Sequence, residues 1–143
     1  MAALTITSTD VKKISGNERT AKVYAGVTVT AGQVVTLNSS QEVVLASTTT
    51  AELAGGGTVN AGLFIALSGG SPGQTIALAS TGSVIDLGVT GIQGKFLFLD
   101  GTSGGIDDSH SALISAEIVS SIGYGNDSDQ VVFSPIITGI AIP

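Results

Sequence analysis

The sequence has no cysteine, no tryptophan and little charge. Without cysteine, neither disulfide bonds nor thiolate zinc sites can hold the fold. Without tryptophan, and with only two tyrosines, the chain has few of the flat aromatic side chains that sugar-binding sites commonly use. Charged residues make up 11% of the chain, against about 25% in a typical domain. We therefore expect part of its apolar surface to meet other protein, through oligomerisation or docking on a larger body.

Long apolar runs are also missing. No stretch reaches the ~18 uninterrupted apolar residues of a membrane helix, and the longest apolar stretches, 61–67 and 136–142, have the length of a strand. The first residues, MAALTITSTDVKK, lack the basic start and apolar core of a secretory signal. We therefore expect neither a membrane protein nor a secretory leader.

The few charges are unevenly distributed. Residues 1–22 contain four of the five basic residues and two acidic ones, a net charge of +2, whereas the remainder has a net charge of −8. An acidic body repels nucleic acid and anionic lipid, so neither is an expected partner. We interpret residues 1–22 as an extended arm that reaches a partner, or else as a solvated terminus, and residues 23–143 as a single β domain. The basic residues of the expected arm are Lys12, Lys13, Arg19 and Lys22.

A unit of glycine, a five-residue strand, a polar turn and a return strand occurs twice, with a fainter third copy. Residues 32–44 (GQVVTLNSSQEVV) align without a gap on residues 73–85 (GQTIALASTGSVI), and residues 94–106 (GKFLFLDGTSGGI) repeat the pattern weakly. The chain also has twenty glycines and few aromatic residues. Strands at intervals of ~8–12 residues predict an all-β fold. We expect a compact sandwich or small barrel built from repeated hairpins, with an extended N-terminal arm.

Further strands are predicted outside the repeats. Val27 and Val29 alternate with threonines, the two-residue period of a half-buried strand. Residues 112–119 are predicted as a strand in preference to a helix capped by Ser109. Pro135 is expected just before the last strand, where its missing N–H does least harm.

Several predicted strands are apolar on both faces. Residues 61–67 and 95–100 have apolar side chains at consecutive positions, which fits strands covered twice, by a second sheet or by a neighbouring subunit. In residues 136–142, one face has three isoleucines and a threonine, and small residues on the other face permit close approach of another backbone. The side chains expected at an oligomer interface are Phe64, Phe96, Phe98, Ile137 and Ile140.

Candidate catalytic residues are few. The one histidine, His110, follows Asp108 and Ser109, which are residue types of a hydrolase triad. Consecutive neighbours do not easily produce the converging geometry of a triad, although a distant serine or acid would complete one. The glycines at 55–57 lack the lysine of a phosphate loop. We expect a surface histidine, no enzyme activity and no cofactor.

Two acidic loops resemble loose calcium loops. They lie at residues 100–108 and 126–129. Neither has the spacing of the twelve-residue calcium loop or the bidentate glutamate at its end. Hydrated turns are the favoured interpretation, and the sequence leaves calcium binding open.

Three short motifs carry a resemblance to a known family. They are AGQ at 31–33, AGLFIA at 61–66 and GQTI at 73–76. Together they start a first hairpin, add a strand of glycine, apolar residues and alanine, and start a second hairpin. In this the chain resembles the small capsid decoration (cement) proteins of tailed bacteriophages, over about residues 21–99.

The resemblance implies a non-enzymatic structural protein of the virion. It would lie on the outer surface of the capsid, commonly as a homotrimer at local three-fold positions, after assembly in the host cytoplasm. It would bind the major capsid protein, bridge neighbouring capsid subunits and strengthen the shell against the pressure of packaged DNA. The N-terminal segment would add as a strand to a capsid edge. The basic residues Lys12, Lys13, Arg19 and Lys22 would then contact an acidic capsid surface.

Another class of function remains open from the sequence. A β-rich receptor- or ligand-binding module of a phage fibre or surface protein would place aromatic or polar clusters in the loops at 100–111 and 124–130.

Overall fold

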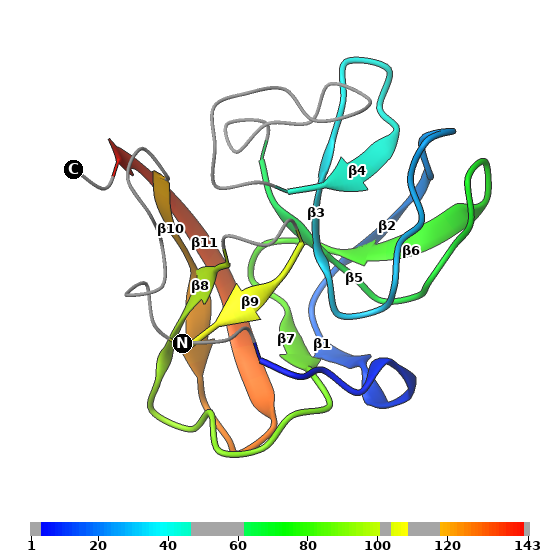
Figure 1. Ribbon diagram of the computed structural model, residues 1–143. Helices are drawn as coiled ribbons and strands as arrows, with labels where there is room; N and C mark the ends of the chain where they lie inside the picture. The colour runs from blue at the N-terminus through cyan, green and yellow to red at the C-terminus, as the bar shows by residue number, and fades with distance from the viewer. Residues whose placement is uncertain (1–3, 47–61, 101–103, 109–117, 142–143) are drawn as a thin grey trace.

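The chain folds into two antiparallel β-sheets that pack on one another (Figure 1). The computed structural model describes residues 4–46, 62–100, 104–108 and 118–141. The predicted all-β sandwich is therefore confirmed. Sheet A has six strands in the order β1 (Lys12–Ser15), β7 (Val84–Asp86), β11 (Gln130–Ala141), β10 (Ile118–Gly125), β8 (Phe96–Leu99) and β9 (Ile106–Asp107). Sheet B has five, in the order β2 (Glu18–Lys22), β6 (Thr75–Ala79), β5 (Phe64–Ala66), β3 (Val34–Leu37) and β4 (Val43–Leu45), and a short 3-10 helix, η1 (Ser8–Asp10), precedes β1.

The main core lies between the two sheets. Alternate side chains of a strand point to opposite faces, so Leu97 and Leu99 of β8 are buried in this core. Phe133 of β11 and Ile65 of β5 meet them there and are fully buried. Full burial of each such side chain contributes roughly 1.5–3 kcal/mol to stability.

Sheet B is covered on its other face as well. Val23, Val27 and Val29 lie over this face and form a second apolar cluster with the outward side chains of β3, β5 and β6. The predicted strand at Val27 and Val29 is wrong, because this segment crosses the sheet as a covering loop and only Val29 forms a bridge, to Gly70. Residues 61–67 are thus covered twice within one chain over the part that the structure describes.

One continuous ribbon links the two sheets. β1 pairs with β7 in sheet A, and β2, two residues further along, pairs with β6 in sheet B. Of the arm expected over residues 1–22, residues 12–15 and 18–22 are instead strands of the sandwich, β1 and β2. The structure also corrects the hairpin predicted at 73–85, because β6 and β7 belong to different sheets.

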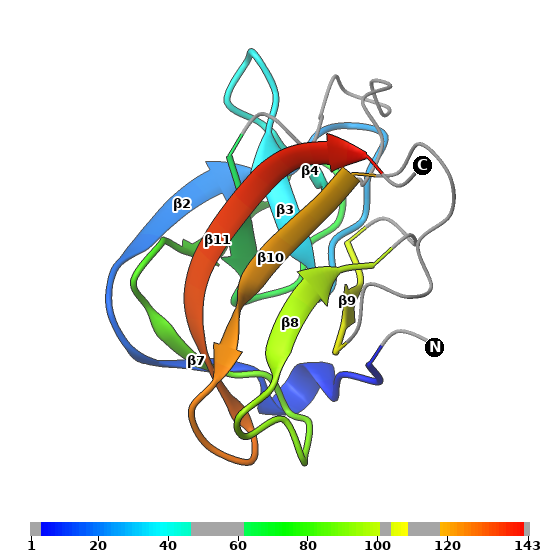
Figure 2. The same ribbon diagram turned by 90° about the vertical axis from the view of Figure 1, so that its left-hand side faces the viewer.

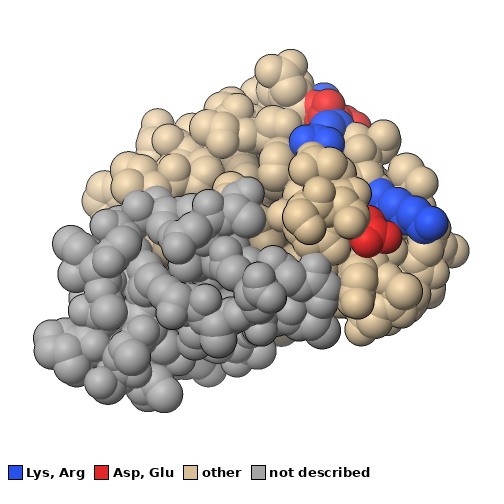
Figure 3. Space-filling view, turned by 90° about the horizontal axis from the view of Figure 1, so that it is seen from above, with Lys and Arg blue, Asp and Glu red and all other residues tan. Residues whose placement is uncertain are grey.

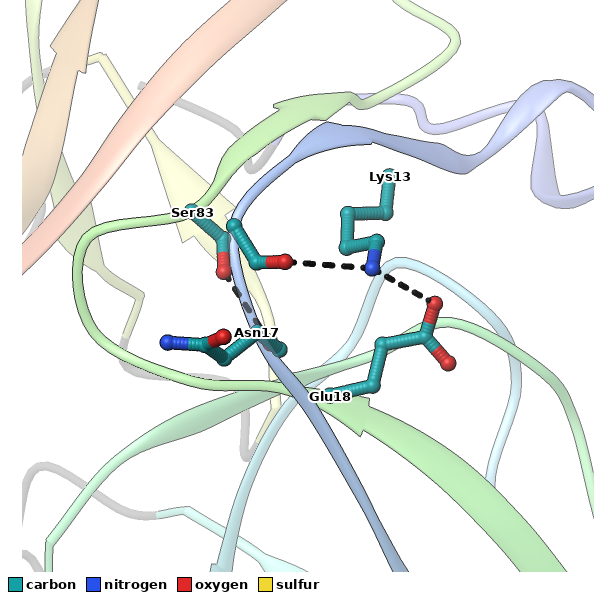
Figure 4. Close-up of polar contacts among 5 residues, drawn as sticks. Lys13, Asn17, Glu18 and Ser83 are labelled. Carbon is teal, nitrogen blue, oxygen red and sulfur yellow. Dashed lines mark hydrogen bonds and ion pairs between the residues drawn. The ribbon is translucent and has the colours of Figure 1, made fainter.

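Gly16 forms the corner of this ribbon, between the ends of β1 and β2, and Figure 4 shows Lys13, Asn17, Glu18 and Ser83 around it. Its φ is +109°, and a Cβ there would clash with Ser83, so only glycine fits against the facing turn. Ser83 Oγ donates to the carbonyl oxygen of Asn17 at 3.2 Å. Lys13 Nζ donates to the carbonyl oxygen of Gly16 at 3.2 Å and forms an ion pair with Glu18 at 3.0 Å. Contacts from both strands of the ribbon thus fix the bend.

β10 and β11 form a long curved pair at the centre of sheet A (Figure 2). Pro135 lies inside the twelve-residue β11 and not before it, which corrects its predicted place. Next to it, the register between β10 and β11 shifts between Ser121 and Gly123. Such an irregularity in the ladder tolerates a residue without an N–H.

Candidate functional site

The four basic residues singled out in the sequence lie along the β1–β2 ribbon. Lys12, Arg19 and Lys22 are exposed, and Lys13 is half-buried beside its partner Glu18. Among the described residues, Lys12, Arg19 and Lys22 form no ion pair. The fold thus brings together, on one edge of each sheet, four of the five basic residues of an acidic protein.

Arg19 also has an aromatic neighbour. Its guanidinium carbon lies 5.7 Å from the centroid of the Phe64 ring, within the range of a cation–π interaction. Phe64 is half-buried on the outer face of sheet B, where it packs against the second apolar cluster. Phe64 therefore lies in sheet B, whereas Phe96 and Phe98, the other phenylalanines expected at an oligomer interface, lie in sheet A.

Sheet A presents a row of apolar side chains on its outer face. Phe96 of β8 lies opposite Tyr124 of β10, Tyr124 lies opposite Val132 of β11, and Val132 lies opposite Val84 of β7. Phe96 is 64% exposed and Tyr124 46% exposed, while Val132 and Val84 are half-buried.

A second row runs beside the first. Phe98 and Ile136 are both aligned with Ser121 of β10, and Ile136 is 60% exposed. At its β9 end the second row continues to Asp107, which is paired with Phe98 and buried, whereas the other members of both rows are uncharged. We refer to the two rows as the apolar face, which consists of Val84, Phe96, Phe98, Tyr124, Val132 and Ile136.

The sequence predicted only part of this face. Phe96 and Phe98 belong to it as expected, whereas Tyr124 and Ile136 join it through the register of β10 with its neighbours. Alternation alone would place Tyr124 on the same face as the buried Ile122, and the register shift between Ser121 and Gly123 turns it outward instead. Ile137 and Ile140 lie in β11, and their side chains are outside the described part of the structure. Seen from above, the described surface is mostly uncharged, and its Lys, Arg, Asp and Glu side chains gather toward one end (Figure 3).

The acidic loop at 100–108 contains two buried aspartates, Asp100 and Asp107. Asp107 is 1% exposed, and neither of its carboxylate oxygens has a hydrogen-bond partner. Burial, followed by the contact with Asp108 and the charge of Asp100, raises the pKa of Asp107. Asp108 forms an ion pair with Lys95 at 3.0 Å, and this hydrogen bond is the main cause that lowers the pKa of Asp108.

The second acidic loop is a tight turn. Asp127 Oδ1 accepts a hydrogen bond from the N–H of Ser128 at 2.7 Å, and the N–H of Asn126 donates to the carbonyl oxygen of Gln130 at 3.1 Å. Within the described ranges, no group of three His, Cys, Asp or Glu side chains is placed to hold a metal ion. His110 and the glycines at 55–57 lie outside those ranges.

A polar groove of about 470 Å³ lies between η1, β1, β7 and the turn before β11. Its walls include the carboxylates of Asp10, Asp86 and Asp129 and the ammonium group of Lys12. Asp86 Oδ1 accepts the N–H of Gly88 at 2.8 Å, so part of its capacity serves the local turn. Small polar molecules and cations fit such walls chemically, but the lining combines both signs of charge and selects neither.

No protein-family model, curated protein or solved structure matches the chain. In the part of the chain that the structure describes, no helix has the length and apolar character needed to cross a membrane. The features of the chain that indicate a function are the two surfaces described above, the β1–β2 ribbon with its basic residues (the basic ribbon) and the apolar face.

Proposed function

We propose that this chain is a non-enzymatic structural protein that assembles through its apolar face and decorates a larger protein shell. The observation that carries the proposal is the apolar face itself. It places Phe96, Tyr124 and Ile136, three of the four large apolar side chains that are most exposed among the described residues, on one sheet face.

An apolar face of this kind favours association with protein. Contiguous apolar surface on a soluble chain commonly marks an interface, because burying it removes apolar area from water at a gain of about 25 cal/mol per Å². The exposed members of both rows carry no charge, and the charged neighbour Asp107, paired with Phe98, is already buried within the chain, so association would bring no further charge into the contact. The strands that carry the face are hydrogen-bonded on both sides in β8, β10 and β11, so little conformational entropy is lost when it is covered.

The shell that we propose is the outer surface of a tailed-bacteriophage capsid. The resemblance of residues 21–99 to capsid cement proteins supports this, as does the all-β fold. In this proposal a homotrimer binds the major capsid protein and bridges neighbouring subunits. The basic ribbon supplies the charge that complements an acidic capsid surface.

The oligomeric state tests the role of the apolar face. Light scattering over a range of concentrations is expected to give three times the 14.1 kDa of one chain. The double variant Phe96→Ser/Ile136→Ser is expected to be a folded monomer. Thr28→Ser, at an exposed position outside the apolar face, is the matched control. A wild-type monomer at all concentrations would contradict assembly through this face in solution.

Co-sedimentation tests the capsid. Shells assembled from the major capsid protein encoded by the same genome are mixed with the purified chain and pelleted. The chain is expected to pellet in a saturable manner and to raise the temperature at which the shells open. A genome with no major capsid protein, or shells that leave the chain in the supernatant, would refute the capsid proposal.

A further inference from the structure

We infer that the outer edge of the β1–β2 ribbon is a docking site for an extended, acidic peptide segment, which adds to it as a further β-strand. The inference deepens the proposed function, because it names the surface that meets the partner, and it rests on that proposal only for the partner's identity. The geometry that supports it is independent of a capsid.

In each sheet, another segment of the chain hydrogen-bonds to the edge strand that lies opposite the ribbon, β9 in sheet A and β4 in sheet B. At the β9 edge, the outward carbonyl oxygen of Ile106 accepts the N–H of Leu4 at 2.7 Å. At the β4 edge, the carbonyl oxygen of Val43 accepts the N–H of Tyr24 at 3.0 Å. Natural proteins cover or blunt sheet edges because unpaired edge groups recruit other strands.

The ribbon is the remaining edge of both sheets. Among the described strands, β1 pairs only with β7 and β2 pairs only with β6, so each is terminal in its sheet. No backbone hydrogen bond among the described residues reaches the outer side of either strand. The two strands run on from one another through Gly16, so the open edge extends across both sheets.

The hydrogen-bond pattern shows which groups of β2 point outward. Ser80 N donates to the Asn17 carbonyl oxygen at 3.0 Å, and Val23 N donates to the Gln74 carbonyl oxygen at 2.8 Å. Because bonded and unbonded positions alternate in an antiparallel pair, Arg19 and Ala21 also face β6. The N–H and C=O groups of Glu18, Thr20 and Lys22 therefore point away from the sheet. A strand added at this edge would hydrogen-bond to these outward N–H and C=O groups.

Charge identifies the occupant. The body of the protein is acidic, yet Lys12, Arg19 and Lys22 stand along this edge without an ion pair among the described residues. Lysines on an edge strand also serve to prevent unwanted pairing. Three unpaired cations on the open edge of a chain with a net charge of −6 favour a strand that carries Asp or Glu. Main-chain bonds would supply affinity, and the cations would select the partner.

The test uses the full chain and the acetylated, amidated peptide ETVETVE. Amide chemical shifts in NMR titrations follow the binding. We expect saturable shifts at the amides of Glu18, Thr20 and Lys22, and weaker binding as salt rises. The peptide KTVKTVK, and ETVETVE with alternate amides N-methylated, are expected to bind at least about tenfold more weakly.

One substitution separates the backbone edge from the fold. Thr20→Pro removes an outward N–H and leaves every β2–β6 bond in place, because proline is tolerated on the solvent side of an edge strand. It is expected to abolish the shifts, whereas Thr20→Val, which keeps the N–H, retains them. The double variant Arg19→Gln/Lys22→Gln is expected to bind up to about tenfold more weakly at low salt.

The outcomes separate this inference from the proposed function. Equal binding of the N-methylated peptide, or full binding by Thr20→Pro, would refute strand addition. Equal binding of KTVKTVK would refute the acidic partner and leave the cations as edge protection. An absence of shifts at millimolar ETVETVE would refute the docking site altogether. Capsid binding that survives Thr20→Pro would refute the capsid as the partner of this edge and leave the capsid proposal standing.

Discussion

Gly16 is the residue at which the β1–β2 ribbon passes from one sheet to the other. Its left-handed φ and its distance from Ser83 are two separate reasons for glycine. Gly16→Ala is expected to lower the free energy of unfolding by about 3 kcal/mol, because it adds both backbone strain and a clash. Urea denaturation measures the change.

Gly82 provides the matched control. Its φ is +92°, and a Cβ there would meet nothing within 4 Å. Gly82→Ala should therefore cost only the backbone strain, about 1 kcal/mol. Equal losses at Gly16 and Gly82 would show that the contact with Ser83 does not constrain the corner.

Asp107 is the residue at which stability depends on pH. Burial raises its pKa, so the folded protein binds this proton more tightly than the unfolded chain does. The protonated form is favourable at low pH, and stability is lost as pH rises from the ordinary pKa of aspartate through the raised pKa of the folded state. Asp107→Asn is therefore expected to raise the melting temperature at pH 7 and to have a smaller effect near pH 4.

The exposed Asp127 is the control for this change. Asp127→Asn alters net charge by the same amount and retains the Oδ1 that accepts the N–H of Ser128. It should leave the melting temperature nearly unchanged at both pH values. If calorimetry gives the two variants the same pH profile, the buried carboxyl is not the source of the dependence.

β2 is the element whose two sides differ most. One side of its backbone is bonded to β6, and the other has no described partner. Amide hydrogen exchange is expected to be slow at Arg19 and Ala21 and fast at Thr20 and Lys22, because exchange requires an unbonded N–H. Uniform slow exchange along β2 in a dilute monomer would contradict an open edge, whereas protection of Thr20 and Lys22 alone on adding a partner would locate the added strand.

Strand positions were largely predictable from the sequence, and sheet membership was not. Apolar runs gave β3, β5 and β8 to within a few residues, because burial needs Val, Ile and Leu at those places. The assignment of β6 and β7 to different sheets depends on contacts such as that between Ser83 and Asn17, 66 positions apart. No local pattern specifies such a contact.

The candidate surfaces show the same division. Lys12, Lys13, Arg19 and Lys22 are close in sequence, but they lie on the paired strands β1 and β2 instead of an arm, and their contact with a capsid stays a prediction. Tyr124 and Ile136 were missed because their place on the apolar face follows from the register of three strands. Register across a sheet is set by long-range packing, which periodicity within one strand does not report.

At the scale of the whole molecule, the two surfaces use different forces on different parts of the sandwich. The apolar face spans the middle strands of sheet A, and the basic ribbon forms an edge of each sheet. One protein can therefore associate with its own copies through the first and with a partner strand through the second. Contact between copies through the apolar face would depend on burial of apolar area. Binding of a partner strand to the basic ribbon would depend on main-chain hydrogen bonds and on the charges of the basic side chains.

Salt distinguishes these two modes of association. At about 1 M salt the screening length falls to about 3 Å, so interactions between exposed charges weaken while apolar burial persists. The mass of the oligomer by light scattering is expected to stay constant between low salt and about 1 M salt, and the affinity of the ribbon for an acidic strand is expected to fall. The Phe96→Ser/Ile136→Ser variant should be monomeric in both solutions and keep its ribbon affinity. An oligomer that dissociates as salt rises would instead place the contact between copies at the basic ribbon, since that is where Lys12, Arg19 and Lys22 are exposed.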